Sequence, residues 1–82
     1  MTQTVLITGS SSGIGKATAI YFADKGRNVV ATMRKPEQET ELTTYDNILV
    51  TALDVTKPET INETLTQAAE RFGKIDVLVN NA

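Results

Sequence analysis

A glycine-rich turn near the N-terminus has the residue types and spacing to bind a ligand. Residues 8–15 are Thr-Gly-Ser-Ser-Ser-Gly-Ile-Gly, a Gly-x-x-x-Gly-x-Gly pattern between a strand-like and a helix-like segment. Glycine at these places permits a sharp exit from a strand, close approach of the backbone to a phosphate and close helix–sheet packing. The free N–H groups and the dipole at a helix start favour an anion. The turn therefore predicts a phosphate site, and a serine-rich βα loop without a ligand is the alternative.

Two other phosphate motifs do not match this turn. A P-loop has the pattern Gly-x-x-x-x-Gly-Lys-Ser/Thr. Ser10 stands where that motif needs its first glycine, and Ala17 stands where a hydroxyl must reach magnesium. The Gly-x-Gly-x-x-Gly fingerprint would start at Gly13 and would need glycine in place of Thr18. The spacing therefore indicates a third type of phosphate turn.

The rest of the sequence alternates between strand-like and helix-like segments. Runs of apolar and β-branched residues predict strands, and apolar residues at helical spacing predict helices. The predicted strands cover residues 4–8, 28–33, 48–53 and 76–79. Between the second and third strands, a turn or so of helix is expected from Pro36 to Leu42, with loop over 43–47.

Each of the two longer predicted helices has an apolar face and a glycine that ends it. The first face consists of Ile14, Ala17, Ile20 and Tyr21, widened by Phe22 and Ala23, with Gly26 after the last turn. The second consists of Ile61, Leu65, Ala68, Ala69 and Phe72, with Gly73 after it. Thr56 and Glu59 have the spacing of a capping box at the start of the second helix.

The order of these segments predicts an α/β fold with a parallel sheet. Right-handed crossovers place the strands in the order third, second, first, fourth, as in one half of a Rossmann-type doubly wound sheet. The chain then changes direction across the sheet beside the glycine turn. The fourth strand would have an uncovered apolar edge, so residues 1–82 are expected to be the front part of one domain.

The composition argues against several kinds of function. The 82 residues include no cysteine and no histidine, and their net charge is −2. Disulfides, thiolate or imidazole catalysis and a metal cluster are therefore not expected. Neither is binding to nucleic acid or to a membrane, since there is no basic excess and no apolar run near the ~20 residues that span a bilayer. The expected location is the cytoplasm.

Three short motifs, in order along the chain, resemble those of the short-chain dehydrogenase/reductase family. They are the glycine turn, Asp54-Val55 after the third strand and Asn80-Asn81-Ala82 after the fourth. The resemblance covers nearly the whole chain. It implies a nicotinamide dinucleotide with its phosphates at the turn, its adenine at Asp54-Val55 and a ribose beside the last motif. Residue by residue, it implies cofactor contacts from Gly9, Ser11, Ser12, Gly13, Ile14, Asp54, Val55, Asn80 and Ala82. Thr8 and Gly15 are expected to be architectural.

The end of the second strand indicates which dinucleotide is bound. NAD sites place a carboxylate there for the ribose 2′-hydroxyl, whereas NADP sites need a cation for the 2′-phosphate. Met33 occupies the acidic position, and Arg34 and Lys35 follow it. Arg34 is therefore added to the predicted site, and the predicted cofactor is NADP(H) rather than NAD(H). A solvated basic pair at a strand end is the alternative.

No catalytic residue is predicted within these residues. Tyr21 and Lys25 have the Tyr-x-x-x-Lys spacing of the family's catalytic signature, but they lie on the first helix, about two turns from the phosphate end. The resemblance implies hydride transfer between nicotinamide and a carbonyl or alcohol substrate, in a homo-oligomer, with the catalytic residues beyond Ala82. The alternatives are a nucleotide-binding fragment or regulator without catalysis, and a fragment that folds only against a partner.

Overall fold

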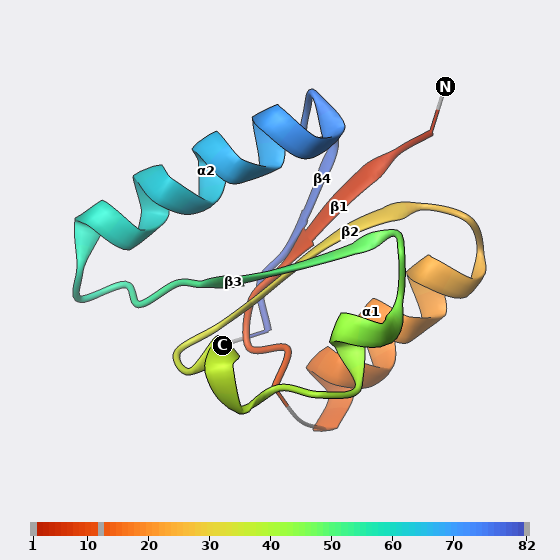
Figure 1. The fold of residues 1–82 in the computed structure, drawn as a ribbon, viewed down its shortest axis with the longest axis horizontal. Helices are drawn as coiled ribbons and strands as arrows, with labels where there is room; N and C mark the ends of the chain where they lie inside the picture. The colour runs from red at the N-terminus through yellow and green to blue at the C-terminus, as the bar shows by residue number, and fades with distance from the viewer. Residues whose placement is uncertain (1, 12, 82) are drawn as a thin grey trace.

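The computed structural model describes residues 2–11 and 13–81, and its centre is a four-stranded parallel sheet (Figure 1). The strand order is β3-β2-β1-β4, which confirms the Rossmann-type order predicted from the sequence. The strands are β1 (Thr4–Ile7), β2 (Asn28–Met33), β3 (Ile48–Ala52) and β4 (Val77–Val79). The helices are α1 (Gly13–Asp24), α2 (Pro58–Phe72) and the short 3-10 turns η1 (Pro36–Gln38) and η2 (Leu42–Thr44).

The sheet has β1 and β2 at its centre. Val5 of β1 pairs with Val29 on one side and with Val77 on the other, so β1 is hydrogen-bonded along both edges. All four residues of β1 are buried. Because parallel strands in such a sheet are covered on both faces, continuous apolar runs form them without polar alternation.

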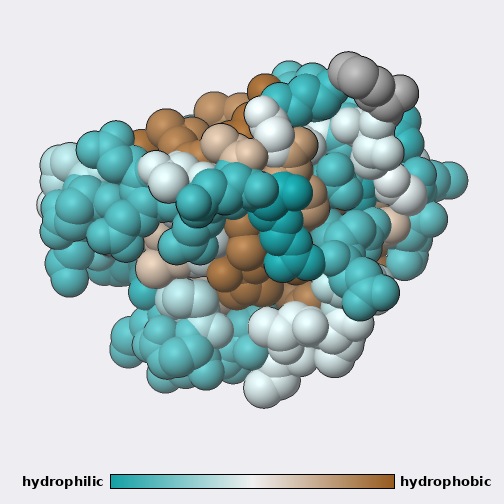
Figure 2. Space-filling view, turned by 45° about the horizontal axis from the view of Figure 1, so that its top comes forward, coloured by the Kyte–Doolittle hydropathy of each residue, from teal (hydrophilic) through white to brown (hydrophobic). Residues whose placement is uncertain are grey.

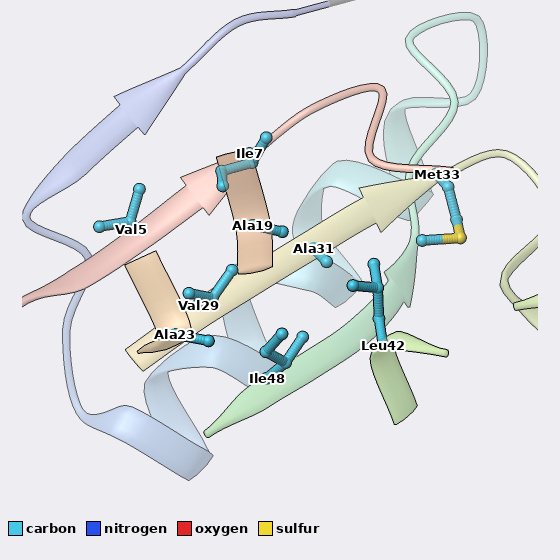
Figure 3. Packing of buried hydrophobic residues seen from close by; sticks show 9 residues of the cluster. All are labelled: Val5, Ile7, Ala19, Ala23, Val29, Ala31, Met33, Leu42 and Ile48. Carbon is cyan, nitrogen blue, oxygen red and sulfur yellow. The ribbon is translucent and has the colours of Figure 1, made fainter. Parts of the chain in front are cut away.

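The helices cover the two faces of the sheet, with α1 on one side and α2 on the other (Figure 1). The larger core lies on the α1 side, where side chains from β1, β2 and β3 meet α1 and η2 (Figure 3). It consists of Val5, Ile7, Ala19, Ala23, Val29, Ala31, Met33, Leu42 and Ile48. The α2 side has a smaller core of Leu6, Val30 and Ala68.

The predicted apolar face of α1 is wrong in part. The buried residues of α1 are Gly15, Ala19 and Ala23, while Ile14 and Tyr21 are 76% and 57% exposed. Small side chains let the helix axis approach the sheet, so the face with the least bulk is the one that packs. Of the larger apolar residues, Ile20 and Phe22 pack against this core, whereas Ile14 and Tyr21 are left toward solvent.

The predicted capping box of α2 is also wrong. Lys57 is the N-cap residue and makes no side-chain cap hydrogen bond, and Pro58 begins the helix. The Thr56 hydroxyl donates instead to Asp54 Oδ1 at 2.6 Å. At the other end, Gly73 has φ +85° and ends the helix, as predicted.

The face that α2 buries differs from the predicted stripe as well. Leu65 is 47% exposed, and Thr64 is buried beside it. The Thr64 and Thr51 hydroxyls lie 3.0 Å apart, and Thr64 Oγ1 also donates to the Ala52 carbonyl at 2.9 Å. These hydrogen bonds satisfy two polar groups that burial would otherwise penalise.

The segment between β2 and β3 departs from its prediction of one helical turn followed by loop. It contains two 3-10 turns, η1 and η2, and the second lies where loop was expected. Leu42, at the start of η2, is fully buried in the core on the α1 side. Leu42, with the partly buried Tyr45 packed against the same core, fixes an otherwise polar connection to the body of the fold.

Some apolar side chains remain at the surface, and Figure 2 shows hydrophobic atoms between larger hydrophilic areas on one face. Leu78 of the edge strand β4 is 66% exposed.

Among the described residues, no helix is long and apolar enough to cross a membrane.

Candidate functional site

The glycine turn connects β1 to α1 through two left-handed backbone positions. Gly9 has φ +64° and Gly13 has φ +61°. A side chain at either position would be strained, because L-residues rarely adopt positive φ. The turn can therefore bend sharply out of the sheet and start a helix within a few residues.

Gly15 allows α1 to begin directly against this turn. A Cβ atom placed on Gly15 would lie 2.0 Å from the Gly9 carbonyl oxygen and 2.7 Å from Asn81 Nδ2. The first of these neighbours is backbone, which cannot rotate away. Gly15 thus has the architectural role expected of it.

Thr8 joins the turn to the end of β4. Its hydroxyl donates to Asn80 Oδ1 at 3.0 Å and accepts the N–H of Asn81 at 2.8 Å. Its backbone N–H donates to the Val79 carbonyl at 3.0 Å. Two segments more than 70 residues apart in sequence are thereby fixed beside each other.

Ser10 has a structural role that the sequence did not indicate. It is fully buried, its hydroxyl donates to the Ile7 carbonyl at 2.9 Å, and its N–H donates to the Thr32 carbonyl at 3.0 Å. The Thr32 hydroxyl donates to the same Ile7 carbonyl at 3.0 Å. The Ser10 hydroxyl is therefore used within the fold and is not offered to a ligand.

A pocket of about 1020 Å³ lies at the carboxyl ends of the strands. This volume is at the upper end of the range for small-molecule sites, about 300–1,000 Å³, and suits a long ligand. One side, here called the turn wall, consists of Thr8, Gly9, Ser11 and Asn80. The charged residues of the lining, here called the charged wall, follow β2 and β3 in the sequence and are Arg34, Lys35, Glu39, Asp54 and Lys57. Thr32, Met33, Gln38, Leu53, Val55 and Thr56 complete the lining.

The Asp54 carboxylate is fixed by its neighbour in the sequence. Its Oδ1 accepts the hydroxyl of Thr56 at 2.6 Å and the N–H of Thr56 at 2.9 Å. Its Oδ2 lies 4.0 Å from Arg34 Nε. The Thr56 hydroxyl and then its N–H hold the pKa of Asp54 below the ordinary value, with smaller contributions from Arg34 and Lys57. The carboxylate is therefore charged and held with one oxygen toward Arg34.

Arg34 differs from Asp54 in being loosely held. Its side chain is 80% exposed, and its ion pair with Asp54 is at the limit of contact distance. An exposed ion pair of this kind contributes little stability, about 0–1 kcal/mol. The guanidinium is thus available to an anion that enters the pocket.

Six of the ten predicted site residues line this pocket. They are Gly9, Ser11, Arg34, Asp54, Val55 and Asn80. Gly13 and Ile14 begin α1 and are exposed, outside the lining. Ser12 and Ala82 lie outside the described residues.

Several lining residues were not among the predicted ones. Lys35 follows Arg34 directly, so its place at a strand end was a usable signal. Glu39 and Lys57 had no local signal, because only the fold brings their segments to the same pocket. Neither Tyr21 nor Lys25 belongs to the lining; the Lys25 ammonium lies over the Tyr21 ring at 5.4 Å, on α1.

A family model described as short chain dehydrogenase matches residues 3–82. The chain belongs to the short-chain dehydrogenase family. The match includes the glycine turn, Asp54-Val55 and Asn80-Asn81-Ala82, so the three motifs that suggested the family lie within it.

Individual relatives agree with this assignment. The chain is 42% identical to oxidoreductase BOA17 of Botryotinia fuckeliana, over 100% of this chain and 31% of the relative. It is 39% identical to the NADP-dependent 3-hydroxy acid dehydrogenase YdfG of Shigella flexneri, over 95% of this chain and 32% of the relative. A crystal structure of a short-chain dehydrogenase from Streptomyces avermitilis matches with a TM-score of 0.86 and 37% identity, covering 100% of this chain and 31% of that one. The chain thus spans about a third of the length of these relatives.

Membership of this dehydrogenase family implies a nicotinamide dinucleotide cofactor. The pocket fits such a group on three observations. Gly9 and Gly13 leave the backbone bare where a phosphate would approach, and a Cβ on Gly13 would meet nothing within 4 Å. The charged wall offers cations, and the volume accommodates a dinucleotide. No cluster of His, Cys, Asp or Glu suited to a metal occurs in the part of the chain that is described.

Proposed function

We propose that this chain is the cofactor-binding part of an NADP(H)-dependent oxidoreductase that acts on a small carbonyl or alcohol substrate. One observation carries the choice of NADP(H). The end of β2 presents two cations, Arg34 and Lys35, to the same pocket that the glycine turn lines, and it presents no carboxylate. A guanidinium binds a phosphate through charge-assisted, often bidentate hydrogen bonds.

The proposed contacts follow the two walls of the pocket. Backbone N–H groups around Gly9 and Ser11 hold the pyrophosphate, together with the start of α1 at Gly13 and Ile14. Asp54 and Val55 contact the adenine, and Arg34 binds the 2′-phosphate. Asn80 borders a ribose, and Ser12 and Ala82 belong to the proposal by their place in the motifs. The bound nicotinamide supplies the chemistry, which is the exchange of a hydride with the substrate.

A relative with a specific name supports this cofactor. The Shigella flexneri protein, 39% identical over 80 residues, is named an NADP-dependent 3-hydroxy acid dehydrogenase. A hydroxy acid is an alcohol substrate of the proposed class. We extend the proposal to a homo-oligomer in the cytoplasm, which solution scattering and cell fractionation would test.

Isothermal titration with NADPH and with NADH tests the cofactor. We expect NADPH to bind about 10-fold or more tightly than NADH, since a charge-assisted contact contributes roughly 1.5–3 kcal/mol. Arg34→Asp should remove most of this difference in affinity, because it should weaken the binding of NADPH and leave that of NADH nearly unchanged. Equal affinity of the unchanged protein for both would refute the NADP(H) preference, and no binding of either would refute the site.

A nucleotide-binding module without catalysis is the second candidate. Tyr21 and Lys25 have the catalytic spacing but lie outside the pocket lining, so this pair gives no support to catalysis. This candidate predicts NADPH binding without oxidation of NADPH by any carbonyl compound. Turnover with a 3-oxo acid or another small carbonyl compound would exclude it.

A further inference from the structure

Lys16 makes two ion pairs at the start of α1. Its Nζ lies 3.3 Å from Glu39 Oε2 and 3.3 Å from Glu41 Oε1. Lys16 directly follows Gly15, where a P-loop would place a phosphate-binding lysine, yet it is engaged by carboxylates that come from beyond η1. The lysine therefore connects the helix start to the segment that follows β2.

The two carboxylates differ in their surroundings. The Glu39 side chain is only 4% exposed, and Glu39 Oε2 also accepts the N–H of Leu42 at 2.8 Å. The Glu41 side chain is 58% exposed. Burial of a charge without a partner is costly, so Glu39 depends on Lys16 far more than Glu41 does.

The charge of Glu39 is a permanent feature at neutral pH. Partial burial acts to raise the pKa of Glu39, but the Leu42 N–H and the Lys16 ammonium outweigh it and hold the pKa below the ordinary value. Partial desolvation acts to lower the pKa of Lys16, and Glu39 and Glu41 outweigh it and raise the pKa. Both groups are thus ionised when a ligand arrives.

Glu39 belongs to the charged wall, where the 2′-phosphate is expected. That wall carries three cations, Arg34, Lys35 and Lys57, and two anions, Glu39 and Asp54. A buried carboxylate repels a phosphate more strongly than an exposed one, because water screens it less. With Glu39 compensated by Lys16, three cations face the single charge of Asp54, a net charge of +2; an uncompensated Glu39 would halve this excess to +1.

We propose that Lys16 is a specificity-determining residue that acts through Glu39: it neutralises the buried carboxylate of the charged wall and so allows this wall to accept a phosphorylated ribose. The inference rests on the proposed function, since it concerns the choice between NADPH and NADH. It makes Lys16 a positioning and compensating residue and assigns it no contact with the cofactor.

Two other roles for Lys16 predict different results. A lysine that contacts the cofactor phosphates directly would strengthen the binding of NADPH and of NADH alike, since both cofactors carry the pyrophosphate. A lysine that only braces the segment after β2 would affect stability and leave the preference between the two cofactors unchanged. The ratio of the two affinities therefore separates the three roles.

The test measures Kd for NADPH and for NADH by titration of the full natural chain and its variants. Lys16→Met should weaken the binding of NADPH about 5- to 10-fold and the binding of NADH less than about 2-fold, as expected for one uncompensated charge in a partly shielded pocket. The preference is the affinity for NADPH divided by the affinity for NADH, called the NADPH:NADH ratio. In the double variant Lys16→Met/Glu39→Gln this ratio should return to within about 2-fold of that of the unchanged protein, because the uncompensated charge is gone.

Matched controls isolate Glu39 from general charge effects. Glu41→Gln removes the other ion pair of Lys16 at the same distance, but Glu41 lies outside the pocket lining, so the affinity ratio should stay constant. Lys25→Met removes one positive charge from the far end of α1 and should likewise leave it constant. Glu39→Gln alone should raise the ratio by about 3-fold, since Lys16 is then left without its buried counter-ion.

Each outcome decides for or against the inference. The inference is overturned if Lys16→Met has the same NADPH:NADH affinity ratio as the unchanged protein. It is also overturned if the double variant binds NADPH as weakly as Lys16→Met does. If Lys16→Met does not fold, as judged by circular dichroism, Glu39→Gln decides: a raised ratio supports the inference and an unchanged one overturns it. If the unchanged protein binds neither cofactor or shows no preference, the proposed function fails first.

Discussion

The pocket has a turn wall at the ends of β1 and β4 and a charged wall at the ends of β2 and β3, and different interactions hold the two together. The turn wall depends on backbone geometry, with positive φ at Gly9 and a helix start that only glycine at position 15 permits. Its main side-chain contact is the short Thr8 bridge to Asn80 and Asn81.

The charged wall depends on side chains. Arg34 is largely exposed, and Asp54 and Glu39 are held by hydrogen bonds from Thr56 and Leu42. Backbone N–H groups attract any phosphate, whereas the placement of cations and carboxylates distinguishes one ribose from another. Under the proposed function, we therefore expect the turn wall to contribute affinity for either dinucleotide and the charged wall to set the preference between the two.

Gly15→Ala is the substitution expected to destabilise the turn wall most. The new methyl would overlap the Gly9 carbonyl oxygen at 2.0 Å, so backbone must move, and we expect a loss of about 3 kcal/mol or more in the free energy of unfolding. Urea unfolding measures this. Gly13→Ala is the matched control, because its methyl meets open space at φ +61° and should cost only about 1–2 kcal/mol of backbone strain. Similar losses in the two variants would contradict the packing argument.

Thr8→Val should destabilise the turn wall less than Gly15→Ala does. Valine has the same shape but cannot donate to Asn80 Oδ1 or accept the Asn81 N–H, so we expect a loss of about 1–2 kcal/mol in stability. Affinity for NADPH and for NADH should fall by the same factor, since the turn wall serves both. Thr18→Val is the control, because the Thr18 hydroxyl donates only to the Ile14 carbonyl within α1. A change in the NADPH:NADH ratio for Thr8→Val would show that the walls are not separable in this way.

The smallest expected effect is the acid dependence of stability. The pKa values of Glu39, Asp54 and Asp76 are all lowered in the folded protein; for Asp76 the main cause is the hydrogen bond from the Thr4 N–H. A lowered folded pKa means that the unfolded chain binds protons more readily. The stabilisation is therefore complete above the ordinary values of 4.5 and 3.8 and is lost as the pH falls through the folded values.

Thermal unfolding measured from neutral pH down to about pH 2.5 checks this dependence. Asp76→Asn is informative, because asparagine can still accept the Thr4 N–H but no longer titrates. Its unfolding temperature should vary less with pH than that of the unchanged protein. An identical pH profile would show that Asp76 contributes nothing to the acid response.

Much of the fold could be predicted because its signals are local. Apolar β-branched runs and the glycines after helices mark the elements within a few residues, and the handedness of crossovers then restricts the strand order. Six predicted site residues line one pocket because the ends of parallel strands meet at one edge of a sheet.

The errors came from contacts that compete with the expected local pattern. The predicted face of α1 was right for Ala23, but it included the exposed Ile14 and Tyr21. The sheet also selects the small residues Gly15 and Ala19, which were not predicted to be buried. Thr56 has capping-box spacing, but its hydroxyl binds Asp54 at the edge of the pocket instead. The competing partner of α1 is the distant sheet, whereas that of Thr56 is a carboxylate only two residues away in the sequence.

The sequence by itself determined the order of strands and helices, the glycine turn and the basic pair after β2, because each is written in residues that are neighbours along the chain. Only the tertiary structure decided that Ser10 is buried, that Thr8 bridges to Asn80 and Asn81, and that Lys16 meets Glu39 across 23 positions. Such contacts depend on where the sheet and helices place segments in space. No periodicity or short motif contains that information.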